Sequence, residues 1–188
     1  MRRSMLAVAL ATALASAAAA EDGTGFWGAV DLGAASLERK YSQTGSTRGT
    51  EFAMALRGGY AWHPRLLLGF ELGGFTLEEG DLSNPSEGEG IQTFYVLAHY
   101  YSDAASKFFL RAGFGHVSYW NNRPAETDAS GSGYVLGAGY EVKRWGAWRL
   151  EPIIEFAAGK FDGAISPPGV QQDQRYQAVT LRLGITYR

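Results

Sequence analysis

The sequence predicts an all-β fold: an eight-stranded antiparallel up-and-down transmembrane β-barrel, preceded by a cleaved signal peptide. Three observations predict it. Apolar and polar residues alternate with a period of two along most of the chain, which is typical of strands and not of helices. The strand-sized segments are separated by alternately long and short connections. Their apolar faces carry no charge at the centre, whereas the opposite faces mix charged residues with glycine.

The first 20 residues predict a secretory signal peptide. Met1-Arg2-Arg3 supplies a short positive region, and an apolar run rich in alanine and leucine follows from Met5. Ala18-Ala19-Ala20 then offers small residues for cleavage before Glu21. Residues 21–188 remain as the barrel domain, a length that suits one domain.

The composition excludes several classes of protein. Cysteine is absent, so the chain has neither disulfides nor thiolate metal sites. The formal net charge is −2, which gives no bulk attraction to nucleic acid. No stretch after the signal peptide approaches the ~20 consecutive apolar residues of a membrane helix. The 25 glycines and the aromatic content of 13% favour an all-β domain, and no cofactor and no metal are expected.

Eight segments carry the alternating pattern, and the last one, residues 178–188, carries it most clearly. There Val179, Leu181, Leu183, Ile185 and Tyr187 alternate with Ala178, Thr180, Arg182, Gly184 and Thr186. The other seven predicted strands are residues 25–36, 51–62, 65–76, 91–102, 107–119, 132–143 and 149–159. Pro152 lacks a ladder donor, so it is expected beside a bulge or a weakened pairing.

The connections between these strands alternate in length. Long polar loops are expected at residues 37–50, 77–90, 120–131 and 160–175, and short turns at 63–65, 103–106 and 144–148. In an up-and-down barrel all the short turns then lie at one end and all the long loops at the other. This asymmetry is typical of an outer-membrane barrel with periplasmic turns and extracellular loops.

Two surfaces of the barrel follow from the alternation. The apolar faces are expected to point outward, because lipid suits them and a spanning sheet must close on itself. A soluble barrel of the lipocalin type is the alternative, and it would place the aliphatic side inside. Aromatic residues near the strand ends predict two girdles at the level of the lipid headgroups: Trp27, Trp62, Tyr100, Tyr119, Trp120, Tyr134, Tyr140, Trp145, Trp148, Tyr176 and Tyr187.

Charged residues of both signs lie on the inward faces. The interior of an eight-stranded barrel is only wide enough for side chains to fill, and buried charges are costly unless they pair. The sequence therefore predicts an ion-pair network that plugs the lumen. A narrow small-solute pore is the alternative. The predicted network consists of Asp31, Arg57, Glu71, Arg111, Glu141, Glu151, Glu155 and Arg182.

Four stretches resemble strands of the OmpA-like and opacity-type outer-membrane β-barrel family. They are Gly25-Phe26-Trp27-Gly28-Ala29-Val30-Asp31-Leu32-Gly33, Phe109-Leu110-Arg111-Ala112-Gly113-Phe114-Gly115, Gly137-Ala138-Gly139-Tyr140-Glu141 and Leu183-Gly184-Ile185-Thr186-Tyr187-Arg188. The resemblance covers essentially the whole mature chain. The family usually ends on an aromatic residue, whereas Tyr187 is penultimate here.

The resemblance implies a location and partners. It implies export through the periplasm to the outer membrane of a Gram-negative-type cell, where the barrel is a monomer with a structural or surface-interaction role. Leu183, Ile185 and Tyr187 resemble the signal that the outer-membrane insertion machinery reads. Outer-membrane lipid and lipopolysaccharide are the other expected partners. Arg39, Lys40 and Arg48 are candidates to contact lipopolysaccharide phosphates, with solvation as the alternative.

Two further constellations have chemical potential. His116 and Ser118 share a strand face and resemble the His and Ser of lipid A 3-O-deacylases, with Glu126 as the orienting acid. Polar positions at a strand end are the alternative, and no catalysis is expected. The acidic segment 77–90 could hold divalent cations, or it could be a solvated loop.

Overall fold

The computed structural model describes residues 24–41, 45–77, 89–121, 129–162 and 174–188. Within these residues nine strands form one sheet. They are β1 (Gly25–Tyr41), β2 (Gly45–His63), β3 (Leu66–Leu77), β4 (Glu89–Tyr101), β5 (Phe108–Asn121), β6 (Ala129–Tyr140), β7 (Lys143–Trp145), β8 (Trp148–Asp162) and β9 (Gln174–Tyr187). The predicted signal peptide lies outside the described residues.

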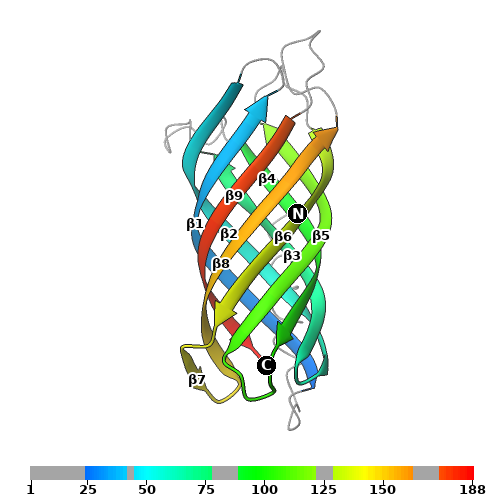
Figure 1. The fold of residues 1–188 in the computed structure, drawn as a ribbon, viewed down its shortest axis with the longest axis vertical. Helices are drawn as coiled ribbons and strands as arrows, with labels where there is room; N and C mark the ends of the chain where they lie inside the picture. Colours follow the sequence, from blue (N-terminus) through cyan, green and yellow to red (C-terminus); the bar gives the residue numbers. More distant parts are fainter. Residues whose placement is uncertain (1–23, 42–44, 78–88, 122–128, 163–173) are drawn as a thin grey trace, which may run out of the picture.

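Eight of these strands close into a ring. Each pairs antiparallel with its neighbours, β6 pairs with β8, and β9 returns to pair with β1 (Figure 1). The paired residues can be followed round the ring from Lys40 on β1, first to Arg175 on β9 and then from strand to strand. The path returns to β1 at Val30, ten residues away from Lys40 on the same strand. This stagger tilts the strands against the barrel axis. The predicted all-β, closed, eight-stranded antiparallel barrel is confirmed.

Several strands extend further toward the loop end than predicted, and the predicted loop at residues 37–50 is wrong. There β1 and β2 stay paired as far as Tyr41 and Gly45. Leu37 still points into the interior, with only 1% of its surface exposed. The outward residues are polar because this part of the hairpin extends past the apolar band, and their polarity resembles that of a loop. In the same way β8 continues to Asp162.

The opposite end of the barrel carries the short turns and the C-terminus (Figure 1). The β2–β3 turn contains Pro64, and β7 forms a small hairpin with β8 through Gly146, whose φ is +61°. Glycine adopts this left-handed conformation without steric cost. Pairing of β8 with β6 stops at Ile153 and resumes with β7 at Leu150. Pro152 lies in this interruption, where a missing donor is tolerated.

The two faces of the sheet separate by chemistry as predicted. The outer face exposes large apolar side chains along every strand of the ring, for example Leu32, Leu68, Leu110, Leu136 and Leu183. The inner face buries the charged residues and the remaining apolar ones. A soluble barrel would reverse this arrangement. No helix within the described ranges is long and apolar enough to cross a membrane.

Side chains fill the interior in three layers. An apolar cluster near the turn end contains Trp27, Ala61, Leu67, Tyr101, Phe109 and Ile153. A larger apolar cluster lies toward the loop end and includes Leu37, Phe75, Ile91, Tyr95, Tyr119, Phe161 and Tyr176. Most of the buried charges lie between these clusters. On β1, for example, Asp31 stands between Trp27 and Leu37.

Three of the predicted girdle residues are inside the barrel, so this part of the prediction is wrong. Trp27, Tyr119 and Tyr176 are 4%, 5% and 1% exposed. Each has the same parity along its strand as an inward charge, so it must point inward with that charge. The other predicted girdle residues are on the outside: Trp62, Tyr100, Tyr134, Tyr140 and Trp145 are exposed, and Trp120, Trp148 and Tyr187 are half-buried.

Candidate functional site

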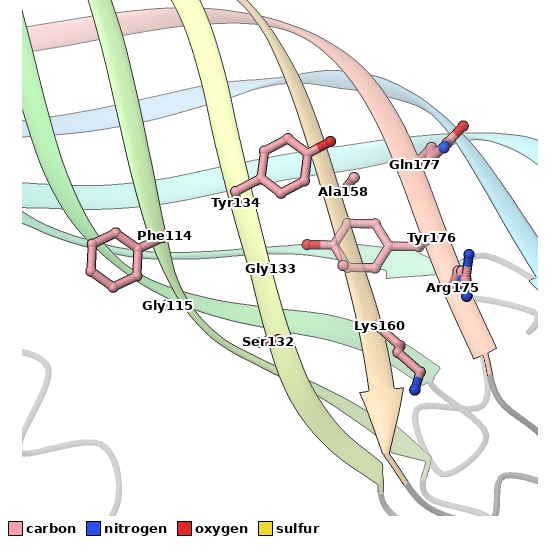
Figure 2. A pocket seen from close by; sticks show the side chains of 11 residues that line it. Phe114, Gly115, Ser132, Gly133, Tyr134, Ala158, Lys160, Arg175, Tyr176 and Gln177 are labelled. Carbon is pink, nitrogen blue, oxygen red and sulfur yellow. The ribbon is translucent and has the colours of Figure 1, made fainter.

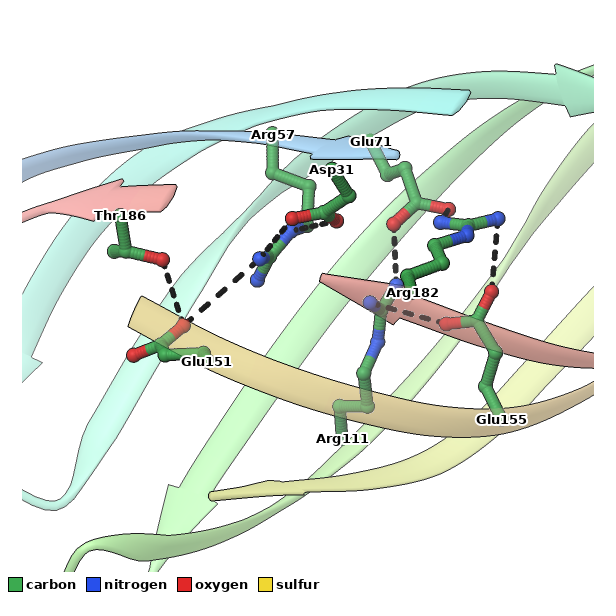
Figure 3. Close-up of polar contacts among 8 residues, drawn as sticks. All are labelled: Asp31, Arg57, Glu71, Arg111, Glu151, Glu155, Arg182 and Thr186. Carbon is green, nitrogen blue, oxygen red and sulfur yellow. Dashed lines mark hydrogen bonds and ion pairs between the residues drawn. The ribbon is translucent and has the colours of Figure 1, made fainter. Parts of the chain in front are cut away.

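Charged side chains from seven positions meet in the middle of the lumen (Figure 3). Alternation places them there, because each is an inward residue of its strand. They come from β1, β2, β3, β5, β8 and β9, so the cluster ties together strands from all round the ring. All seven are at most 3% exposed: Asp31, Arg57, Glu71, Arg111, Glu151, Glu155 and Arg182.

Four of these residues form a closed square of ion pairs. Arg182 contacts Glu71 at 3.2 Å and Glu155 at 2.8 Å. Arg111 contacts Glu155 at 3.1 Å and also donates a hydrogen bond to Glu71. Each guanidinium therefore bridges the same two carboxylates, and every corner of the square has two partners of opposite charge.

A second group adjoins the square. Arg57 donates two hydrogen bonds of 2.6 Å to the two oxygens of Asp31, the bidentate geometry that is strongest for this pair. Arg57 also lies 3.9 Å from Glu151, which accepts a hydrogen bond of 2.6 Å from the Thr186 hydroxyl. A Cβ on Gly184 would intrude on this Asp31–Arg57 pair, so a glycine there leaves the room it needs.

Glu141 was predicted in the same network but lies apart from it, near the turn end. It accepts two hydrogen bonds of 2.8 Å from Arg144, and Arg149 lies 3.2 Å away. Burial opposes ionisation of Glu141, but the hydrogen bonds from Arg144 and the charge of Arg149 prevail and hold the pKa of Glu141 below its usual range. The predicted single network is thus two separate groups.

Aromatic rings cover the charged layer on both sides. Toward the turn end His99 stacks on Phe109, with ring centroids 5.2 Å apart, and contacts Trp27 at the same distance. Toward the loop end the hydroxyls of Tyr95 and Tyr176 share a hydrogen bond of 2.7 Å across the lumen. These rings separate the charges from both mouths of the barrel.

Several interior residues were not predicted as members of the site. Alternation predicts that Thr186, His99 and Tyr95 point inward, and the structure buries them, but no role beside the charges was predicted for them. Tyr176 has the same inward parity but was assigned to the outer girdles. Arg144 is different, because it lies on β7, which the sequence pattern does not predict.

His116 and Ser118 lie on the outer surface of β5, as their register predicts. His116 is exposed and faces Phe94 and Ser132, and Ser118 is half-buried and faces Gln92 and Ser130. These cross-strand neighbours contain no carboxylate. Glu126 and most of the acidic segment 77–90 lie outside the described residues.

The C-terminal residues of the predicted insertion signal line the outer wall. Leu183 and Ile185 are exposed there, and Tyr187 packs edge-on against Trp148 at 5.0 Å. Arg188 connects the end of the chain to the turn region. Its side chain donates a hydrogen bond of 2.7 Å to the Pro64 carbonyl, and its guanidinium carbon lies 4.9 Å from the centroid of the Tyr101 ring.

Comparison with known proteins agrees with this architecture. The model of the outer membrane protein beta-barrel domain family matches residues 5–188. The chain belongs to this family. The match confirms the resemblance inferred from the strand motifs, and it indicates the outer membrane of Gram-negative bacteria as the location of this outer-membrane barrel.

Neisserial surface protein A, a solved structure, shares the fold. It is 16% identical, with a TM-score of 0.55 over 86% of this chain and 96% of that chain. The attachment invasion locus protein Ail of Yersinia pestis is 11% identical, with a TM-score of 0.48 over 86% and 98%. OprG of Pseudomonas aeruginosa is 12% identical, with a TM-score of 0.46 over 88% and 97%. Curated proteins give no match by sequence.

Proposed function

We propose that this barrel is a monomeric structural or surface-interaction protein of the outer membrane, with a lumen closed by its charged and aromatic side chains. The observation that carries the proposal is the layered interior. Among the described residues, a charged layer whose members pair with one another lies between two apolar clusters, and this arrangement favours a lumen without a continuous polar path for water. A small-solute pore would need such a path.

The proposal gives the outer surface and the loop end the role of contacting partners. The wall is apolar and suits lipid, and the strands β1, β2, β8 and β9 carry polar and charged residues past the apolar band. Outer-membrane lipid and lipopolysaccharide are the partners that this arrangement favours. The insertion machinery would read the C-terminal strand during assembly.

Planar-bilayer recording tests the closed lumen. The purified, folded barrel is expected to give no large, stable single-channel steps. The outer-surface variant Ser130→Ala serves as a control preparation, and it should likewise give no large, stable steps. Large and stable steps from the unmodified protein would show an open pore and end the proposal.

The proposal also excludes catalysis by His116 and Ser118. Their placement on the lipid-facing wall is the observation in favour of a lipid A deacylase, but their cross-strand neighbours supply no acid to orient the histidine. Mass spectra of lipid A from cells with and without the protein should be identical. A 3-linked acyl chain that is lost with the protein and retained with Ser118→Ala would establish the enzyme instead.

A further inference from the structure

Three cations stand side by side on the outer wall at the loop end. Lys40 of β1 is the direct cross-strand partner of Arg175 of β9, and Arg175 is the direct partner of Lys160 of β8. All three side chains are exposed on the outer face. Like charges directly opposite one another disfavour strand pairing, so an anion that lies across this basic row would stabilise it.

Two carboxylates of the described residues offset part of this charge. Lys40 lies 3.6 Å from Glu38, and Lys160 lies 3.5 Å from Asp162. Both pairs are solvent-exposed, and such pairs are weak. Arg48 is the cross-strand partner of Glu38, so a further cation adjoins the same carboxylate. The described part of this surface therefore keeps a net positive charge.

A hollow of about 590 Å³ opens in the wall beside the basic row (Figure 2). Lys160 and Arg175 lie on its loop-end side, and the Tyr134 ring lies further along the wall. Its lining includes Gly133 and Gly159, and two of the outward side chains beside them, Ser132 and Ala158, are small. Ser132, the direct partner of Lys160, adds a hydroxyl at the rim.

The hollow lies at the border between the apolar wall and the polar strand ends. Toward the turn end the same wall exposes Tyr134, Leu136, Ile154 and Val179, which suit acyl chains. Toward the loop end it exposes the cations. A molecule that fits both parts has a phosphorylated, hydroxyl-rich headgroup and several hydrocarbon chains.

We propose that the basic row and the adjoining hollow bind the phosphorylated headgroup of a glycolipid from the outer leaflet. The phosphate lies across Lys40, Arg175 and Lys160 and relieves their repulsion. The sugar rests against Tyr134 and accepts or donates hydrogen bonds at Ser132. This inference rests on the proposed function, which places the loop end of the wall at the outer leaflet.

Native mass spectrometry of the folded barrel in detergent tests the site. The probes are lipid A with its phosphates, the same lipid after their removal, and inorganic phosphate. The unmodified protein is expected to retain one molecule of phosphorylated lipid A. Lys160→Gln combined with Arg175→Gln should weaken this binding at least tenfold, and lipid A without phosphates should bind the unmodified protein as weakly.

A matched control removes the same charge at the other end of the barrel. Arg65→Gln combined with Lys143→Gln alters two exposed cations of the turn end and should leave lipid binding unchanged. Equal binding by the Lys160/Arg175 variant, or an equal loss in the control, would overturn the proposal. Inorganic phosphate that binds alone and displaces the lipid would assign the site to free anions.

Two readouts separate this inference from the proposed function. Slower migration on a gel after boiling shows that each variant is a folded barrel. Planar-bilayer recording reports the lumen and should be the same for the unmodified protein and the Lys160/Arg175 variant. If the variant loses lipid binding and still gives no channel steps, the result supports the lipid site and leaves the proposed function intact. If the unmodified protein gives large channel steps, the proposed function fails, whatever the lipid binding.

Discussion

At the residue scale, the interior charges hold the barrel in one arrangement. A buried charge is costly without a partner, and here each member of the Arg111–Glu71–Arg182–Glu155 square has two partners of opposite charge. Removing one of the two arginines leaves two carboxylates sharing a single guanidinium. Removing a cation therefore costs more than the pair itself contributes.

Arg111→Met tests this cost. The variant is expected to lose about 3–5 kcal/mol of unfolding free energy, because Glu71 and Glu155 stay buried with Arg182 as their shared partner. Urea unfolding in lipid vesicles, followed by tryptophan fluorescence, measures the loss. The exposed Arg48→Met should change stability by no more than about 0.5 kcal/mol. Similar values for both variants would contradict the role of the square.

Glu141 gives a prediction about pH. Its pKa is held below the ordinary value of 4.5, so its contribution to stability is present above that value and is lost as pH falls through the lower pKa of the folded state. Glu141→Gln should be less stable than the unmodified protein at pH 7, by up to about 1 kcal/mol, since Arg144 is half exposed.

The difference between these two proteins should shrink as pH falls through the lowered pKa of the folded state, because the carboxyl of Glu141 then becomes neutral in both states. Urea midpoints at several pH values measure it. A difference that stays constant with pH would show that the Arg144 contact does not depend on the charge of Glu141.

The sequence predicted the interior charges well but not their pairing. Parity along each strand is enough to place Asp31 or Arg182 inside. Which carboxylate meets which guanidinium depends on barrel stagger and on side chains crossing the lumen, and neither is a local property. For this reason Glu141 was grouped with residues that it does not contact. Trp27 was assigned to the wrong face for a different reason, because its aromatic character was given more weight than its parity with Asp31.

At the element scale, the barrel depends on the pairing of its first and last strands. Gly33 of β1 lies opposite Arg182 of β9 at this junction. A Cβ on Gly33 would overlap the Leu181 carbonyl oxygen and lie 2.7 Å from the Cα of Arg182. The two backbones therefore approach more closely than a side chain at this position allows.

Gly33→Ala is expected to destabilise the folded barrel by about 1–3 kcal/mol or more, since the β1 and β9 backbones must move apart. The fraction that migrates as folded barrel on an unboiled gel, after refolding into vesicles, measures this loss. Gly28→Ala is the matched control on the same strand, because its Cβ would meet the Arg57 carbonyl oxygen at an ordinary 3.7 Å. Equal folded fractions for the two variants would refute the close-approach account.

The number and order of the ring strands could be predicted because polar and apolar residues alternate along most of each strand, whereas the short β7 could not. Strand ends could not, and the β1–β2 hairpin explains why. Beyond the apolar band its outward residues face water, so residues 37–50 combine polarity with continued pairing. Burial still alternates at Leu37, but the serine, threonine and glycine residues near it are typical of a loop, so the sequence predicts a loop there.

At the scale of the whole molecule, the barrel reverses the polarity of a soluble protein. Its exposed surface is apolar along every strand of the ring, and its centre holds ion pairs between aromatic layers. Water around such a wall would be unfavourable, whereas lipid suits it. The inward charges and the apolar outer wall are consequences of the same orientation.

Accessibility of the wall tests this orientation most directly. The chain contains no cysteine, so single cysteines can carry a nitroxide label attached before folding into vesicles. Labels at Leu68, Leu136 and Leu183 should collide often with oxygen, which dissolves in lipid, and rarely with a water-soluble nickel complex. A label at Ser46, near the loop end, should show the reverse. Nickel accessibility at the three leucine positions equal to that at Ser46 would contradict the account.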